Sequence, residues 1–167
     1  MTEQPSPTAP KKILYIDMDG VICDFASGLA KLEPELRQRY LDKEDTIPPI
    51  FTLLDPMPGA IEAVTELSGL FDTYILSTVP WAHRTGASDK LDWIKTHFGH
   101  EEGTPLWKRV ILTHHKDLNR GDFLVHDRPR NGADRFEAAN PGAEWIHFGQ
   151  DRFPDWATVL PYLRERA

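Results

Sequence analysis

The stretch ILYIDMDGV, Ile13–Val21, decides how the rest of this sequence is interpreted. Its first four residues form a continuous apolar run, which predicts a strand that is buried on both faces of a parallel sheet. Two carboxylates, Asp17 and Asp19, follow at once, and Gly20 then lets the chain turn away. A buried strand that ends in two acids spaced by one residue predicts a rigid mount for a polar site at the edge of a sheet.

Four more apolar runs are continuous rather than alternating: Tyr74–Leu76, Val110–Leu112, Phe123–Val125 and Trp145–Phe148. Helical patterns lie between several of these runs and after the last. The first covers residues 58–70, and Gly69 could end it. The second covers residues 88–99, with Ser88 and Gly99 as caps and with Leu91, Ile94 and Phe98 on one face. The third covers residues 154–166, and Pro161 must kink or divide it. Strands that alternate with helices indicate an open α/β sheet.

The alternation breaks between the first and second runs, where residues 25–56 contain no clear strand pattern. The segment KLEPELRQRYLDKED in this part is charged and helix-like, so we expect a small helical cap inserted after the first strand. Residues 12–24 and 57–167 would form the core domain. Residues 1–11 are rich in Pro, Ser and Thr, and we expect them to form a disordered tail.

Length, charge and cysteine content exclude several classes of protein. The chain has 167 residues, which suits one domain with a small insertion. A net charge of −7 argues against binding to a nucleic-acid polymer, which needs a basic face. No apolar run approaches the length of a membrane helix, and the N-terminus lacks the pattern of a signal or transit peptide. The single cysteine, Cys23, excludes an internal disulfide and indicates a cytoplasmic protein.

Polar side chains follow the first four runs, at the points where the strands would end. They are Asp17 and Asp19; Ser77 and Thr78; Thr113, His114, His115 and Lys116; and His126, Asp127 and Arg128. Because ligands of open α/β sheets bind at the carboxyl ends of the strands, we expect these side chains to converge on one crevice.

The predicted crevice holds residue types that suit phosphoryl transfer. Asp17, Asp19 and Asp127 offer the hard oxygen ligands that Mg²⁺ prefers. Ser77 or Thr78 could donate a hydrogen bond to a phosphoryl oxygen, although both could also be ordinary hydroxyls at a strand end. Lys116 can neutralise the charge of such a group, and a carboxylate can attack phosphorus to form an aspartyl-phosphate.

Several motifs resemble those of one known superfamily. DMDGV after a strand is similar to the first motif of the haloacid dehalogenase (HAD) superfamily, and LST, Lys116 and HDRP resemble its second, third and fourth motifs. The resemblance is closer to the 5′(3′)-deoxyribonucleotidases, the cytosolic type C 5′-nucleotidases. Six segments match that family in order: DMDGVICDF, PMPGAIEA, STVP, KLDWI, LTHHK and FLVHDRP. Together they span roughly residues 13–130.

The resemblance implies a HAD-like Rossmannoid fold of three α/β/α layers, with a central parallel sheet and the small cap. It implies a Mg²⁺-dependent phosphohydrolase, and a (deoxy)ribonucleoside monophosphate is the leading substrate. Asp17 would be the nucleophile. Asp19 would protonate the leaving oxygen and then activate water.

The remaining roles that the resemblance implies concern the metal and the substrate. Mg²⁺ would bind the Asp17 carboxylate, the main-chain carbonyl of Asp19, and Asp127. Ser77 and Lys116 would hold phosphoryl oxygens, with Thr78 as the neighbouring hydroxyl. Phe25 matches an aromatic residue that lines the nucleobase side in the family.

Two departures from the family leave alternatives open. His126 stands where the family has an acid, so the site is one charge less negative; a nucleotide-binding module without turnover is therefore an alternative. The insertion is shorter than in the animal enzymes, so another small phosphomonoester is a second alternative. We expect Arg128 to brace its loop through a salt bridge, and Trp81 either to approach the substrate or to lie at the rim without contact. A homodimer is compatible with the sequence.

Overall fold

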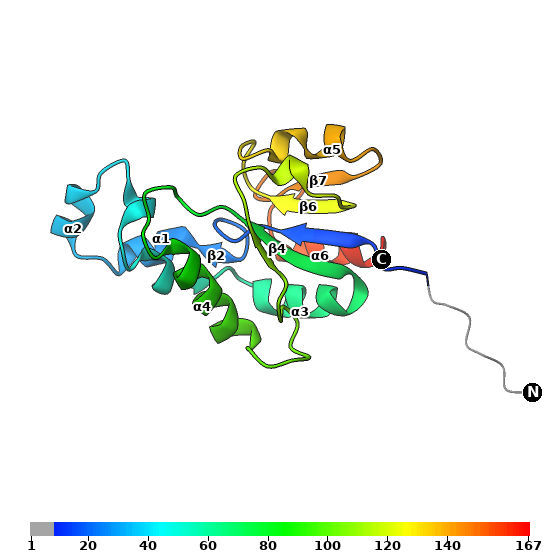
Figure 1. Cartoon of the computed structure of the whole chain (residues 1–167), viewed down its shortest axis with the longest axis horizontal. Coiled ribbons are helices and arrows are strands. Elements are labelled where there is room, and N and C mark those ends of the chain that lie inside the picture. The colour runs from blue at the N-terminus through cyan, green and yellow to red at the C-terminus, as the bar shows by residue number, and fades with distance from the viewer. Residues whose placement is uncertain (1–8) are drawn as a thin grey trace, which may run out of the picture.

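A five-stranded parallel sheet forms the centre of the structure, a computed structural model that describes residues 9–167 (Figure 1). Residues 1–8 of the expected tail lie outside the described residues. The strand order is β5–β4–β1–β6–β7, with β1 Ile13–Ile16, β4 Asp72–Ser77, β5 Val110–Leu112, β6 Phe123–His126 and β7 Glu144–His147. The predicted α/β fold is confirmed, and β1 lies in the middle of the sheet with a parallel strand on each side.

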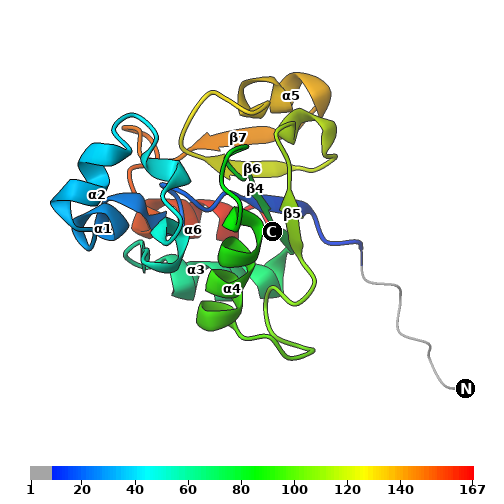
Figure 2. The same cartoon turned by 60° about the vertical axis from the view of Figure 1, so that its left-hand side comes forward.

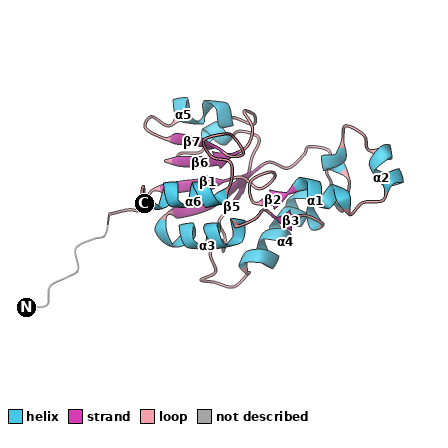
Figure 3. Ribbon diagram, turned by 180° about the vertical axis from the view of Figure 1, so that it is seen from behind, coloured by secondary structure: helices cyan, strands magenta, loops and turns pink. Residues whose placement is uncertain are grey.

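The two faces of the sheet carry separate apolar clusters because successive side chains of a strand point to opposite faces. Leu14 and Ile16 of β1 pack with residues of α3 (Ala60–Leu70) and α6 (Trp156–Arg164). Tyr15, between them, packs on the other face with Phe136 of α5 (Phe136–Ala139). Seen from behind, α3 and α6 lie over one face of the sheet, and α5 lies beside β7 (Figure 3). Burial on both faces explains why the apolar runs are continuous.

The helices differ from the predicted ones in three details. Helix α4 spans Gly86–Phe98 and has Thr85 rather than Ser88 at its N-cap position. Gly99 ends this helix as predicted, but Gly69 does not end α3, which continues to Leu70. Helix α6 runs through Pro161 as one helix. None of the helices in residues 9–167 has both the length and the apolar character needed to cross a bilayer.

The inward face of α4 also differs from the prediction. Leu91 is 38% exposed, whereas Lys90, Trp93 and Ile94 are buried. The spacing of 90, 93 and 94 is as regular as that of the predicted face, and it turns a lysine toward the interior. Lys90 therefore lies on the buried face of α4, although the predicted face did not include it.

The inserted segment begins and ends at a two-stranded antiparallel ribbon, β2 (Cys23–Asp24) with β3 (Asp55–Pro56). Strand β3 lies in the part where no strand was expected. Between the two strands lie short helices rather than one long helix: α1 Phe25–Ala30, α2 Pro34–Arg39 and the 3₁₀ turns η1 Glu44–Thr46 and η2 Ile50–Thr52. This segment extends away from the sheet, and η2 packs against α4 (Figures 1 and 2).

Candidate active site

The carboxyl ends of β1, β4 and β6 meet at one open cavity of about 520 Å³. Asp17 and Asp19 from the loop after β1, Thr78 after β4, and His126 and Asp127 at the end of β6 all line it. Residues of the inserted segment, including Phe25 and Asp42, line the same cavity. The predicted convergence of strand ends is thus present, with the inserted segment facing it.

Asp17 is buried and lies against a fully buried lysine. Its Oδ1 is 2.8 Å from Lys116 Nζ, and Lys116 also donates to the main-chain carbonyl of Leu76 at 2.5 Å. Burial alone would raise the pKa of Asp17, but the charges of Lys116, His126 and Lys90 hold that pKa below its ordinary value. Asp17 is therefore an ionised carboxylate held in one orientation.

The pKa of Asp19, two residues further along the chain, is shifted in the opposite direction. Burial raises its pKa, and the charge of Asp17 adds to this against the lowering effect of Lys90. Its Oδ2 accepts a hydrogen bond from Lys90 Nζ at 2.7 Å, whereas its Oδ1 is buried without a hydrogen-bond partner among residues 9–167. One oxygen is anchored and the other is free to hold a proton, so Asp19 is suited to acid–base work.

Lys90 is a candidate site residue that was not predicted from the sequence. Its side chain is fully buried, lies over the ring of Phe51 at 4.6 Å from the centroid, and donates to Ser77 Oγ at 3.0 Å as well as to Asp19. The motif KLDWI matches the family pattern, but the resemblance assigns no role to its lysine. A lysine in the apolar stripe with Trp93 and Ile94 was the available signal, because lysines are almost never fully buried unless paired.

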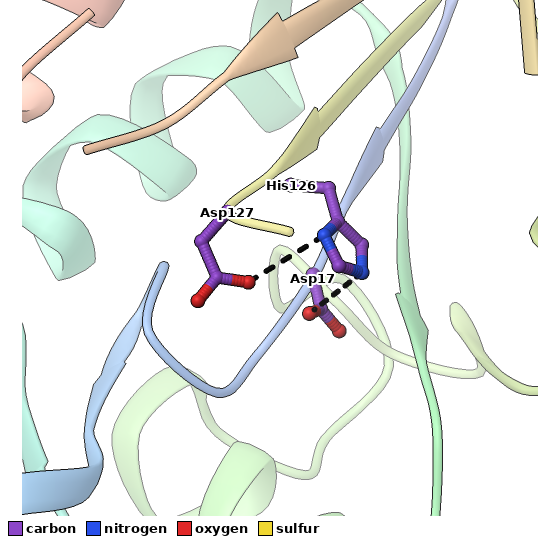
Figure 4. A group of neighbouring side chains, drawn as sticks. All are labelled: Asp17, His126 and Asp127. Carbon is purple, nitrogen blue, oxygen red and sulfur yellow. Dashed lines mark ion pairs between the residues drawn. The ribbon is translucent and has the colours of Figure 1, made fainter. Parts of the chain in front are cut away.

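His126 faces both acids, Asp17 and Asp127, and each of its ring nitrogens is directed toward one of them (Figure 4). Its Nδ1 accepts the main-chain N–H of Arg128 at 2.9 Å, so the proton of the neutral ring is on Nε2, 3.3 Å from Asp17 Oδ2. Burial lowers the pKa of His126 to about 4, and the cationic Lys116, Arg128 and Arg130 add to this effect against Asp17. His126 is thus a neutral donor in the place where the family has an acid.

Asp127 occupies space that only a glycine leaves open. Gly20 has φ +75°, and a Cβ added to it would lie 2.3 Å from Asp127 Oδ2. Arg128 Nε contacts the same Oδ2 at 3.2 Å, which is the bracing salt bridge expected for this arginine. Burial and the charge of Asp17 raise the pKa of Asp127.

Two side chains of β7 hold the loop that carries Asp127, and neither was predicted as a site residue. His147 Nε2 hydrogen-bonds to the carbonyl of Asp127 at 2.9 Å, and Trp145 Nε1 donates to the carbonyl of His126 at 3.0 Å. The two rings stack on each other with centroids 4.4 Å apart. This pairing fixes the backbone on which His126 and Asp127 stand.

The predicted substrate-contacting residues differ in their availability. Ser77 Oγ accepts from Lys90, so its own hydroxyl proton is free to donate. Thr78 lines the cavity, but its hydroxyl donates to the carbonyl of Thr113 at 2.7 Å. Phe25 lines the cavity from the start of α1, with its ring 6.5 Å from that of Phe51. Ser77 thus has a free hydroxyl proton but is fully buried and does not line the cavity, whereas Thr78 lines the cavity with its hydroxyl already engaged.

The donor set fits a hard divalent cation better than a softer one. Donor atoms of Asp17, His126 and Asp127 lie within 4.8 Å of one another. Both ring nitrogens of His126 are in use, one accepting from the backbone and one carrying its proton toward Asp17. The carboxylate oxygens of Asp17 and Asp127 remain, and their mutual repulsion is what a cation would relieve.

Solved structures with similar folds are HAD-like hydrolases. A haloacid dehalogenase-like hydrolase from Streptococcus pneumoniae matches with a TM-score of 0.56 at 13% identity over 91% of this chain and 90% of that one. A hydrolase of the same description from Xanthomonas campestris matches with a TM-score of 0.56 at 10% identity over 93% and 96% of the two chains. At these identities the likeness supports the fold alone.

Sequence comparisons identify the family. A protein of Vibrio phage KVP40 to which the name 5′(3′)-deoxyribonucleotidase is assigned is 45% identical over 92% of this chain and 85% of its own length. The human cytosolic 5′(3′)-deoxyribonucleotidase is 31% identical over 92% of this chain and 86% of its own. Residues 26–159 match the family model described as 5′ nucleotidase, deoxy (Pyrimidine), cytosolic type C protein. The chain therefore belongs to the cytosolic type C deoxyribonucleotidase family, whose members are phosphoric monoester hydrolases.

Proposed function

We propose that this protein hydrolyses a (deoxy)ribonucleoside monophosphate through an aspartyl-phosphate on Asp17, with Mg²⁺ as cofactor. The observation that carries the proposal is the contrast between two carboxylates in one cavity, with the pKa of Asp17 lowered and that of Asp19 raised. When the pKa values of two neighbouring carboxylates are shifted in opposite directions, the ionised one can act as nucleophile and the protonated one as general acid.

In the first step, a carboxylate oxygen of Asp17 forms a bond to phosphorus while the bond from phosphorus to the leaving oxygen breaks. The proton on Asp19 moves to that oxygen, so the nucleoside leaves as a neutral alcohol. Lys116, held against Asp17 at 2.8 Å, would counter the charge of the transferring group. Ser77, which accepts from the same Lys90 that donates to Asp19, would donate its hydroxyl proton to a phosphoryl oxygen.

In the second step, water attacks the phosphorus of the aspartyl-phosphate and the bond to the Asp17 oxygen breaks. Asp19, deprotonated by the first step, accepts a proton from that water, and inorganic phosphate is released. Asp19 thereby returns to its protonated form and Asp17 to its carboxylate. Lys90 keeps Oδ2 of Asp19 in place through both steps.

Asp17 and Asp127 would hold the Mg²⁺, with the main-chain carbonyl of Asp19 as the third expected ligand. A bound Mg²⁺ supplies positive charge to the phosphoryl oxygens and orients them for attack. A HAD hydrolase from Bacillus subtilis with a similar fold, TM-score 0.54 at 12% identity, is described as bound to magnesium. His126 would stay outside the ligand set and donate to Asp17.

A nucleotide is favoured as substrate because the relatives are named deoxyribonucleotidases. The cavity also offers an aromatic wall at Phe25 beside the phosphate end. We further infer action in the cytoplasm, since the single cysteine is a buried free thiol and the human relative is of the cytosolic type.

The test is phosphate release from a panel of nucleoside 5′- and 3′-monophosphates and sugar phosphates, with Mg²⁺ and with chelator. We expect a nucleotide to lead the panel, and Asp17→Asn to lower the rate by roughly 10³-fold or more at a temperature where circular dichroism shows that the variant is folded. Release that is fastest from a sugar phosphate would indicate another small phosphomonoester as substrate. Tight nucleotide binding without release, unchanged in Asp17→Asn, would instead show a binding module.

A further inference from the structure

The acids at the strand ends are balanced by cations of the protein itself. Each acid forms an ion pair with one lysine or arginine: Asp17 with Lys116 at 2.8 Å, Asp19 with Lys90 at 2.7 Å, and Asp127 with Arg128 at 3.2 Å. Both lysines are fully buried, so their pairs are screened only weakly. These pairs leave little negative charge in the group for a metal ion to balance.

His126 holds the oxygen of Asp17 that Lys116 does not pair with. Lys116 Nζ is 2.8 Å from Oδ1, whereas Nε2 of His126 is 3.3 Å from Oδ2. The main-chain N–H of Arg128 donates to Nδ1 of the same ring, so the proton of the neutral ring is on Nε2 and is directed toward Asp17 (Figure 4). Both oxygens of Asp17 therefore have a partner within the protein.

An acid in place of His126 would give the site an unbalanced charge. The two ring nitrogens of His126 are 3.3 Å from Asp17 Oδ2 and 3.5 Å from Asp127 Oδ1. The ring is buried, and a third carboxylate at such distances from two others would be repelled by both. A site of that kind would need a bound cation to be stable, whereas the site with a neutral histidine does not.

Of the three clustered residues, only Asp17 and Asp127 offer oxygens to a metal ion. Mg²⁺ keeps several of its waters and is usually bound by one or two carboxylates together with phosphate oxygens of the substrate. We propose that His126 balances the site in the free protein, so that the site is ordered without Mg²⁺ and binds Mg²⁺ tightly only together with a phosphate group. This inference rests on the proposed function and describes how the same site acquires its metal.

The coupling between metal and phosphate is tested on the wild-type protein by calorimetric titration with Mg²⁺, with and without inorganic phosphate. The titrations are corrected for the complex that the two ions form in solution. We expect phosphate to lower the dissociation constant of Mg²⁺ about tenfold or more, and Mg²⁺ to lower that of phosphate by the same factor, because a coupling free energy is reciprocal. An equal affinity for Mg²⁺ with and without phosphate would overturn the inference.

The part played by His126 is tested with His126→Asp, which adds a carboxylate between Asp17 and Asp127. We expect this variant to bind Mg²⁺ about tenfold more tightly than wild type when phosphate is absent. In chelator it should melt roughly 5 °C below wild type, and added Mg²⁺ should remove the difference. Weaker binding of Mg²⁺ by the variant would show that His126 is itself a ligand and would contradict the inference. Melting in chelator that matches wild type would contradict it as well.

Two control variants separate the charge at position 126 from other effects. His126→Gln keeps this position neutral, and we expect it to bind Mg²⁺ as weakly as wild type. His100→Asp adds the same charge at an exposed histidine outside the cavity, and it should change neither the affinity for Mg²⁺ nor the melting in chelator. If either control gained as much affinity for Mg²⁺ as His126→Asp, the inference would be wrong.

Binding and melting need no turnover, so they separate a failure of this inference from a failure of the proposed function. Coupled binding of Mg²⁺ and phosphate, without phosphate release from any monoester, would overturn the proposed hydrolysis and keep the inference. Release from a nucleotide by a protein that binds Mg²⁺ equally well without phosphate would keep the hydrolysis and overturn the inference.

Discussion

The two walls of the cavity are built in different ways. At the strand ends, Asp17 is held by a fully buried lysine, Lys116, and by a buried histidine, His126. On the inserted segment, Asp42 and Asp45 are exposed and form no ion pair within residues 9–167. Each of the three acids of the first wall, Asp17, Asp19 and Asp127, has a fixed cationic partner, whereas the acids of the second wall face water.

This difference matches the two tasks that we propose for the cavity. Chemistry at phosphorus needs groups that are oriented before the substrate arrives, and buried ion pairs between strand ends provide that order. Recognition of the leaving group tolerates exposed side chains, because small differences in affinity are enough to rank substrates. The strand-end wall should therefore be sensitive to substitution, and the inserted wall should not.

The largest expected effect is that of Lys116→Met, which leaves Asp17 buried without its main counter-charge. Removing one partner of a buried ion pair costs about 3–5 kcal/mol, so we expect a large loss of unfolding free energy together with loss of phosphatase activity. Chemical denaturation and phosphate release measure the two effects. Lys43→Met, at an exposed lysine of the inserted segment, is the matched control. A variant as stable as wild type would show that the pair is not essential to the first wall.

Lys90→Met should act on catalysis through the position of Asp19. We expect kcat to fall by about 10- to 100-fold for an alkyl phosphate, whose leaving oxygen needs a proton, with a smaller change in KM. The loss should be much smaller for p-nitrophenyl phosphate, whose leaving group departs as an anion. Lys95→Met, an exposed lysine on the same helix, is the control. Equal losses for both leaving groups would contradict a role through Asp19.

The unfolding free energy should depend on pH because of His126, which belongs to the strand-end wall. The folded pKa is about 4, below the ordinary 6.5, so the unfolded chain binds the proton first. The stability linked to His126 is therefore complete above pH 6.5 and is lost as pH falls toward 4.

The measurement is unfolding free energy against pH in the presence of chelator. Between pH 7 and pH 5 we expect wild type to lose about 2 kcal/mol more than His126→Gln, which has no titrating ring. His115→Gln, at an exposed histidine, should follow the wild-type curve. Parallel curves for wild type and His126→Gln would show that this histidine is not buried in its neutral form.

The smallest expected effect is that of Asp42→Asn on the second wall. Asp42 is exposed with φ +61°, a conformation that Asn adopts as readily as Asp, so stability should change by less than about 0.5 kcal/mol. Hydrolysis of 2-deoxyribose 5-phosphate should also stay at the wild-type rate. A marked loss of either, by thermal melt or phosphate release, would show that the inserted wall shares in the chemistry.

Much of the fold could be predicted because burial on both faces leaves continuous apolar runs in the sequence. All five runs end within one residue of the end of their strands, and only β4 begins as much as two residues before its run. The inserted segment was harder, since its short helices and the two-residue strand β3 are too brief to produce a periodic pattern. Asp17, His126 and Asp127 could be predicted to lie together because the carboxyl ends of parallel strands meet at one edge of the sheet. Their roles remain predictions.

The sequence by itself determined the order of the strands along the chain, the carboxylates that follow β1 and β6, and the family to which the chain belongs. Only the tertiary structure decided the partners of those carboxylates: Lys90 on Asp19, a neutral His126 on Asp17, and Gly20 beneath Asp127. The physical reason is the distance along the chain between the residues that make these contacts. Periodicity and motifs are local properties of the chain, whereas Lys90 is 71 residues from Asp19 and meets it only when α4 packs beside the loop after β1.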